Sequence, residues 1–245
     1  MTEKSLTDTE ASRLPSPEDR ERIRLNLETV CQAIAPYPVT LMAATKTVPA
    51  PLIRYAIEAC GLTDVGENRV QELLAKYDEL APTGARIHFI GRLQPNKVKY
   101  LIGRVCLIHS LDSVKLAEEI SKRSAARGLV TDTLCEVNIG EEAAKGGVPE
   151  GDVPGFLTAV SGLPGLRVRG LMVIGPHCPD PEDYRPFFLR TKALFDRMVR
   201  EGRFGPEPIL SMGMSDNYAL AAACGATIIR PGTAVFGARP RPADP

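Results

Sequence analysis

Residues 39–67 read VTLMAATKTVPAPLIRYAIEACGLTDVGE and contain two β-rich runs separated by a helical segment. The first run, residues 39–45, is almost entirely apolar, which is typical of a parallel strand covered on both faces. The segment PAPLIRYAIEAC predicts a helix, and DVGE at residues 64–67 predicts the next strand. A strand, a helix and a further strand form one βαβ unit, so this stretch favours an α/β fold.

The same alternation continues to the end of the chain. Helical segments such as VQELLAKYDEL and FLRTKALFDRMVREG separate further β-rich runs. The predicted strands are residues 39–45, 64–67, 87–91, 105–111, 133–139, 168–175, 208–214 and 227–232. Eight strands alternating with helices favour a single (β/α)8 TIM barrel. An open, doubly wound sheet is the alternative, because periodicity does not show whether a sheet closes.

The first part of the chain predicts an extra N-terminal helix. The stretch from Pro17, PEDRERIRLNLETVCQAIA, has acidic residues in its first turn and apolar residues at helical spacing. These apolar residues are Ile23, Leu27, Val30 and Ile34. No linker rich in Pro and Gly divides the chain. We therefore expect a flexible leader at residues 1–17, one barrel domain at 18–240 and a disordered tail at 241–245.

Charge and hydropathy exclude several functional classes. The 245 residues contain 30 Lys and Arg against 30 Asp and Glu, so the formal net charge is zero. A neutral chain gives no electrostatic reason to expect nucleic acid or an anionic membrane as its main partner. No apolar run is long enough to span a bilayer, and the N-terminus lacks the apolar region of a signal peptide. We expect a soluble protein of the cytoplasm.

The cysteines predict neither a metal site nor a disulfide framework. The six cysteines lie 29 to 46 residues apart, without any C-x-x-C pair and without histidines at ligand spacing. We expect most of them to be small buried hydrophobic residues.

Lys46 is the first candidate for chemistry. By the two-residue period of a strand, Thr40, Met42, Ala44 and Lys46 share one face. Lys46 therefore ends the first strand at the carboxyl edge, where barrel active sites lie. One interpretation is a lysine that extends into solvent. The other is an amine with a lowered pKa that attacks a carbonyl carbon.

The last two predicted strands supply a candidate phosphate site. In TIIRPGTAVFG, residues 227–237, Ile228 and Arg230 share one face, and Gly232 and Thr233 follow. SMGMSDN, residues 211–217, places hydroxyl groups and a glycine after the seventh strand. Barrels often bind phosphate with the loops after strands seven and eight. A plain turn is the alternative for SMGMS alone.

A lysine amine and a phosphate site across one barrel mouth suggest a ligand with an aldehyde and a phosphate. Pyridoxal 5′-phosphate (PLP) is the leading candidate. A second possibility is a barrel enzyme that handles a sugar phosphate through Lys46, as an aldolase does, without a cofactor. Within GENRVQE, residues 66–72, Asn68 either hydrogen-bonds a ligand or caps the following helix. His88 is interpreted as a core histidine of a strand.

Seven segments, in this order, resemble the pyridoxal phosphate homeostasis protein family and, more distantly, the N-terminal barrel of alanine racemases. The segments, between residues 43 and 239, are ATKTVP, GENRVQE, HFIGRLQPNK, NIGEEAAKGG, GLMVIG, SMGMS and RPGTAVFGAR. The resemblance implies that Lys46 holds PLP as a Schiff base, that Arg230 faces the pyridine nitrogen and that Asn68 approaches the ring. The full set of implied cofactor-binding residues is Lys46, Asn68, Ser211, Met212, Ser215, Arg230, Gly232 and Thr233.

The resemblance also implies a carrier that acts in PLP homeostasis and delivers the cofactor to PLP-dependent apoenzymes, without major catalytic turnover. An amino acid racemase of the alanine racemase type is the alternative. Two-base racemisation needs a second acid/base group, which in racemases resembles a tyrosine of an additional C-terminal domain. We expect this protein to lack that domain and therefore to act as a carrier. We expect a monomer, with a dimer as the alternative.

Four residues depart from the family pattern. These are Asp216-Asn217 in the loop after the seventh strand, Arg69 after Gly-Glu-Asn, and Pro231, which lacks an N–H group. None of these departures affects Lys46 or Arg230.

Overall fold

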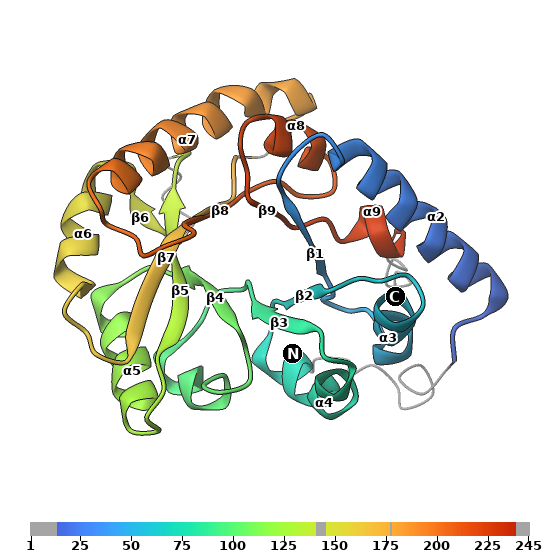
Figure 1. Cartoon of the computed structure of the whole chain (residues 1–245), viewed down its shortest axis with the longest axis horizontal. Coiled ribbons are helices and arrows are strands. Elements are labelled where there is room, and N and C mark those ends of the chain that lie inside the picture. The colour runs from blue at the N-terminus through green and yellow to red at the C-terminus, as the bar shows by residue number, and fades with distance from the viewer. Residues whose placement is uncertain (1–13, 141–145, 177, 239–245) are drawn as a thin grey trace, which may run out of the picture.

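The strands of the computed structural model form a closed ring of parallel strands surrounded by helices (Figure 1). The structure describes residues 14–140, 146–176 and 178–238. The ring consists of β1 (Thr40–Ala44), β2 (Asp64–Glu67), β3 (Arg86–Phe89), β4 (Leu107–Leu111), β5 (Thr131–Asn138), β7 (Leu166–Val173), β8 (Ile209–Ser211) and β9 (Ile228–Ile229). Neighbouring strands pair in parallel, and the pairing of β4 with β5 and of β1 with β9 closes the ring. The prediction of a (β/α)8 barrel is confirmed, and the open sheet is excluded.

Helices follow the strands around the outside of the ring (Figure 1). The α-helices are α2 (Pro17–Ile34), α3 (Ala50–Glu58), α4 (Val70–Leu80), α5 (Val114–Ala125), α6 (Val153–Val160), α7 (Arg185–Arg200), α8 (Tyr218–Ala223) and α9 (Thr233–Phe236). The 3-10 helices are η1 (Ala81–Thr83), η2 (Pro95–Tyr100), η3 (Glu150–Asp152) and η4 (Pro181–Tyr184). Between β3 and β4 the 3-10 helix η2 takes the place of an α-helix.

All eight predicted strands are present, but the last two are shorter than predicted. β8 ends at Ser211, because Gly213 has a φ of 93° and leaves the extended conformation. β9 contains only two residues, and Pro231 beyond it has no N–H to continue the ladder. A two-residue strand that the sequence did not predict, β6 (Val148–Pro149), pairs with β5.

The N-terminal helix α2 begins with a capping box. The Ser16 hydroxyl accepts a hydrogen bond from the Asp19 N–H, and the Asp19 carboxylate accepts one from the Ser16 N–H. Its predicted apolar stripe is buried, and in Figure 1 the helix lies beside α9 and α3. The extra N-terminal helix is confirmed. Pro17, predicted as the end of a leader, is its first residue, while residues 1–13, 141–145 and 239–245 lie outside the described residues.

Apolar side chains fill two separate layers. The larger cluster lies between the strands and the helices. The smaller one lies inside the ring and contains Met42, Ile90, Leu107, Leu134, Met172 and Ile228, with Ala44 and Ile209 against it. Ala43, by contrast, belongs to the outer cluster. The predicted face of the first strand, Met42 with Ala44, is therefore the inner face of the barrel.

The expectation that most cysteines are buried was wrong. Only Cys135 and Cys224 are buried, whereas Cys31 and Cys106 are exposed. Cys31 lies next to the buried Val30 on α2 but outside its apolar stripe, and Cys106 precedes β4. No helix within the described part of the chain has both the length and the apolar character needed to cross a bilayer.

Candidate functional site

Lys46 lies at the carboxyl end of β1. The strand ends at Ala44, and Thr45 turns its side chain outward, where its hydroxyl donates a hydrogen bond to Glu67 at 2.7 Å. Lys46 follows Thr45 in the turn that leaves the carboxyl end of β1, two residues beyond the inward-facing Ala44. The half-buried Lys46 side chain is thus placed at the mouth of the barrel. This is the position that the sequence predicted.

Arg230 is a fixed cation inside the same end of the barrel. It follows β9 and is only 5% exposed. Its Nη1 donates to the Ser211 hydroxyl at 2.8 Å, and its Nη2 donates to the Val173 carbonyl at 2.8 Å. Burial lowers the pKa of the guanidinium to about 10, and the negative charge of Glu136 opposes that shift. Arg230 therefore remains positively charged at neutral pH.

A chain of buried hydrogen bonds leads from Arg230 across the barrel, and we call it the interior chain (Arg230, Ser211, His109, His88, Asp64). The Ser211 hydroxyl lies 3.0 Å from His109 Nδ1. His109 Nε2 lies 2.9 Å from His88 Nδ1, and His88 Nε2 lies 2.8 Å from the Asp64 carboxylate. His88 is thus a buried strand histidine, as predicted, whereas the interior chain was not predicted.

The directions of these hydrogen bonds follow from the carboxylate at the end. An ionised carboxylate only accepts, so His88 donates to Asp64, His109 donates to His88, Ser211 donates to His109 and Arg230 donates to Ser211. Burial lowers the pKa of both histidines and keeps them neutral. Burial alone would raise the pKa of Asp64, but hydrogen bonds from His88 and Thr63 leave it lowered. The interior chain therefore connects the Arg230 cation to an anion on β2.

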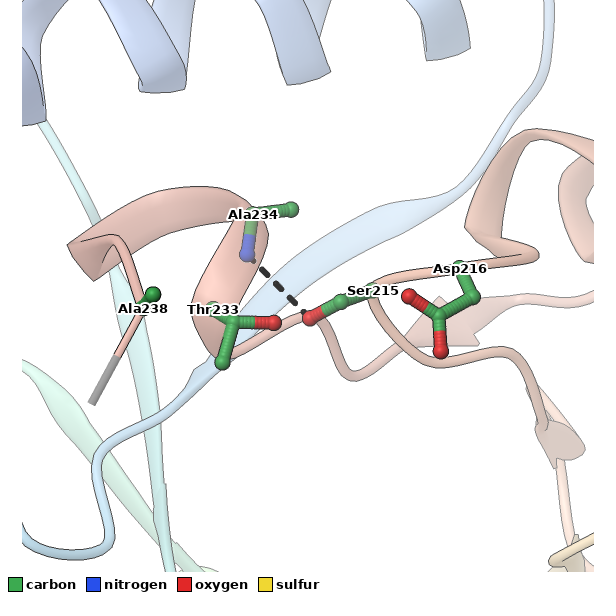
Figure 2. Close-up of a pocket in the computed structure, with 5 residues that line it drawn as sticks. All are labelled: Ser215, Asp216, Thr233, Ala234 and Ala238. Atoms are coloured by element: carbon green, nitrogen blue, oxygen red, sulfur yellow. Dashed lines mark hydrogen bonds between the residues drawn. The ribbon is translucent and has the colours of Figure 1, made fainter. Parts of the chain in front are cut away.

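A pocket of about 630 Å³ adjoins the loops after β8 and β9. It is lined by Ser215, Asp216, Thr233, Ala234 and Ala238 (Figure 2). The Ser215 hydroxyl accepts hydrogen bonds from the Gly232 N–H at 3.0 Å and the Ala234 N–H at 3.2 Å. The Ser215 and Thr233 hydroxyl groups line the pocket, and the Gly232 and Ala234 N–H groups that hold Ser215 lie beside it, so the pocket gathers the group types that bind a phosphate dianion. The exposed Asp216 carboxylate adds negative charge to the same pocket.

Gly232 lets the loop after β9 approach the end of β1. A Cβ atom at this position would lie 3.1 Å from the Ala44 carbonyl oxygen. The Ala44 N–H also donates to the Pro231 carbonyl at 2.9 Å. Pro231 thus joins β1 to the loop through its carbonyl, although it offers no N–H. These contacts bring the pocket and the Lys46 loop to the same edge of the barrel.

The loop that carries Ser215 is held by the buried Asn217. The Asn217 side-chain oxygen accepts a hydrogen bond from the Met214 N–H at 2.8 Å, and its own N–H donates to the Met214 carbonyl. At Gly213, any Cβ would collide with Ala221, so a glycine is required there. Asn217, one of the departures from the family pattern, therefore supports the loop.

Asn68 does not cap the helix that follows it. The N-cap of α4 is Arg69, and no side chain caps this helix. The Asn68 side-chain oxygen is buried and has no hydrogen-bond partner in the described part of the protein. Burying such an oxygen without a partner is costly, which favours the ligand-binding interpretation. Arg69 itself extends into solvent, 67% exposed.

Two predicted site residues lie away from the pocket. Ser211 is fully buried within the interior chain, where it supports Arg230. Met212 packs in the outer cluster between strands and helices, so its side chain points away from the barrel interior. The structure brings together Ser215, Gly232 and Thr233 but not these two residues.

Glu136 is an acidic residue at this end of the barrel that the sequence reading missed. It alternates with Leu134, which lies in the inner cluster, so it shares the inner face of β5. Burial and the nearby Asp112 raise the pKa of Glu136 to about 7, while Arg230 and Arg92 act in the opposite direction. The available signal was a carboxylate that alternates with the apolar Leu134 and lies between the apolar Cys135 and Val137. Across the described ranges, no three His, Cys, Asp or Glu side chains gather as metal ligands would.

The comparisons with known families agree with this geometry. The family model described as the alanine racemase N-terminal domain matches residues 19–240. A protein from Aquifex aeolicus called pyridoxal phosphate homeostasis protein is 49% identical over 199 residues, which cover 81% of this chain and 86% of that protein. A protein of the same name from Pseudomonas aeruginosa is 39% identical over 225 residues, covering 91% of this chain and 95% of that protein.

One solved structure is similar over most of its length. The structure of PipY from Synechococcus elongatus with PLP bound matches with a TM-score of 0.79 and 32% identity, covering 88% of this chain and all of that chain.

Proposed function

The chain belongs to the alanine racemase N-terminal domain family and, within it, to the pyridoxal phosphate homeostasis proteins, and we propose that it binds PLP in the cytoplasm, holds it on Lys46 as a Schiff base and delivers it to PLP-dependent apoenzymes. One observation carries this proposal. A lysine amine, a buried guanidinium and a pocket of hydroxyl and N–H groups lie at one end of the barrel.

The residues present fit the three polar parts of this cofactor. Lys46 would take the aldehyde, and the pocket around Ser215 and Thr233 would take the phosphate. Arg230 would face the pyridine nitrogen, and the unpartnered Asn68 side chain is available to the ring. Among the described residues that line the pocket, the Asp216 carboxylate opposes the binding of a dianion. We assign Ser211 to the support of Arg230 rather than to the phosphate.

When bound, the cofactor supplies an aldehyde that condenses with the lysine amine, so that a C=N bond forms and one water molecule leaves. Arg230 stays protonated and cannot give its proton to the pyridine nitrogen. The interior chain holds this guanidinium through Ser211, and the Val173 carbonyl holds its second nitrogen. A ring nitrogen that faces a fixed cation would remain unprotonated and be a poor electron sink, which argues against transaminase-type chemistry.

Absorbance spectroscopy tests the proposal. The protein mixed with PLP should develop a visible band that free PLP lacks, and Lys46→Ala should abolish it. Lys46→Arg is the matched control, because it keeps the positive charge but cannot form the C=N bond. Absence of the band in the wild-type protein would contradict the proposal.

Two further assays separate a carrier from an enzyme. The protein loaded with PLP should restore the activity of a PLP-dependent apoenzyme faster than an equal amount of free PLP does. Both samples are assayed in a buffer that traps free PLP. Incubation with L- and D-alanine should show no racemisation above background. Turnover that Lys46→Ala abolishes would instead favour the racemase alternative.

A further inference from the structure

Lys76 is a lysine in the apolar stripe of α4. The buried residues of this helix are Val70, Leu73, Lys76 and Leu80, and Lys76 is only 6% exposed. Lysine is almost never buried to this degree unless its charge is paired. Its amine donates to the Thr45 carbonyl at 2.9 Å and to Glu67 Oε1 at 2.8 Å. The lysine therefore reaches the loop that carries Lys46 from behind the sheet.

The backbone on both sides of Lys46 is held by side chains from β2 and α4. On one side, Lys76 binds the Thr45 carbonyl and Glu67 binds the Thr45 hydroxyl. On the other side, the Thr47 N–H donates to the Glu72 carboxylate at 2.7 Å. Glu72 Oε2 also lies 3.6 Å from the Lys76 amine, so the charged side chains form one cluster. We call Glu67, Glu72 and Lys76 the rear cluster.

Two features indicate that the rear cluster is more than a stabilising ion pair. Thr47 has a φ of 64°, a left-handed conformation that a β-branched residue adopts only when its surroundings impose it. The second oxygen of Glu67 is buried and has no hydrogen-bond partner in the part of the chain that the structure describes. Strained backbone and an unsatisfied buried oxygen both cost stability, and such costs gather at functional sites.

We propose that the rear cluster of Glu67, Glu72 and Lys76 consists of positioning residues that hold the Thr45–Thr47 backbone so that Lys46 projects into the barrel mouth. This inference rests on the proposed function of Lys46. The rear cluster acts through the two peptide groups that flank Lys46.

The test measures how fast PLP is captured on Lys46. Protein and PLP are mixed, borohydride is added after set delays, and the Lys46 peptide is quantified by mass spectrometry. Lys76→Met keeps the length of the side chain but removes its charge and its hydrogen bonds. We expect it and Glu72→Ala each to slow capture about 10-fold, equivalent to ~1.4 kcal/mol. Unchanged rates in both variants would overturn the proposal.

Backbone strain gives a rescue experiment. Glycine adopts the left-handed conformation without cost, so Thr47→Gly in the Glu72→Ala background should recover part of the lost rate. Leu80→Ala, at the far end of α4, is the control for general destabilisation. It should lower the melting temperature and leave the capture rate unchanged. An equal slowing in this control, or no recovery in the double variant, would count against positioning.

A second readout needs no cofactor. Acetic anhydride labelling of Lys46 in the cofactor-free protein reports the reactivity of its amine, and Lys76→Met should change the pH profile of that labelling. If the wild-type protein gains no PLP adduct at Lys46 in the borohydride experiment, the proposed function is refuted. The labelling profiles would still decide whether the rear cluster positions this lysine. Identical profiles would refute the positioning role.

Discussion

Replacing Glu136 with glutamine should make the cofactor-free protein more stable at high pH. Burial raises the pKa of Glu136 from an ordinary 4.5 to about 7. Between these values the folded state keeps a proton that the unfolded state has released, so stability decreases as the pH rises through this window. The full cost is reached above pH 7 and amounts to ~3 kcal/mol at 1.36 kcal/mol per pH unit.

Partial exposure reduces that figure. Because Glu136 is not fully buried, solvent screens its charge, and we expect Glu136→Gln to increase the free energy of unfolding by about 2 kcal/mol at pH 8. At pH 4 the side chain is mostly protonated in both the folded and the unfolded state, and the difference should fall to within ~0.5 kcal/mol. Urea unfolding at pH 8 and pH 4 measures both values.

The matched control is Glu58→Gln, which removes an exposed carboxylate paired with Arg54 on α3. Surface pairs of this kind contribute little, so the control should change stability by less than ~1 kcal/mol at either pH. Equal stability of Glu136→Gln and wild type at pH 8 would refute the reasoning. So would a stabilisation that is the same at both pH values.

Three other substitutions test the site. Asp64→Leu leaves the His88 N–H without an acceptor inside the barrel. It should lower the free energy of unfolding, measured by urea titration, by about 2–4 kcal/mol. Asp64→Asn keeps an oxygen acceptor and should lower it by less. Gly213→Ala combines a φ of 93° with a collision against Ala221 and should lower the melting temperature; an unchanged value would contradict the required glycine. Arg230→Glu should shift the visible spectrum of the bound cofactor, and an unaltered spectrum would argue against contact with the ring nitrogen.

The alternation of strands and helices was predictable because each strand of this barrel is covered on both faces. β-rich runs, most of them apolar, marked all eight ring strands, and the two-residue period correctly placed Met42 and Ala44 on one shared face, which is the inner one. The ends of β8 and β9 were not predictable from apolar runs. The positive φ of Gly213 ends β8, and the missing N–H group of Pro231 ends β9. β6 has only two residues and leaves no periodic signal.

The contacts that join distant parts of the chain could not be predicted. His109 meets Ser211 across 102 residues, and Lys76 meets Thr45 across 31, because barrel closure and helix packing bring them together. A lysine in a helix is usually solvated, so sequence alone gave no reason to bury Lys76. The inward direction of Ser211 was available from its alternation with Ile209, which lies against the inner cluster.

The central claim is that Lys46 alone forms the covalent bond to the cofactor. Borohydride reduction of the protein loaded with one equivalent of PLP, followed by peptide mapping, tests it most directly. We predict a single stable adduct on the peptide that contains Lys46. Adducts spread over surface lysines such as Lys99, with none at Lys46, would contradict the account.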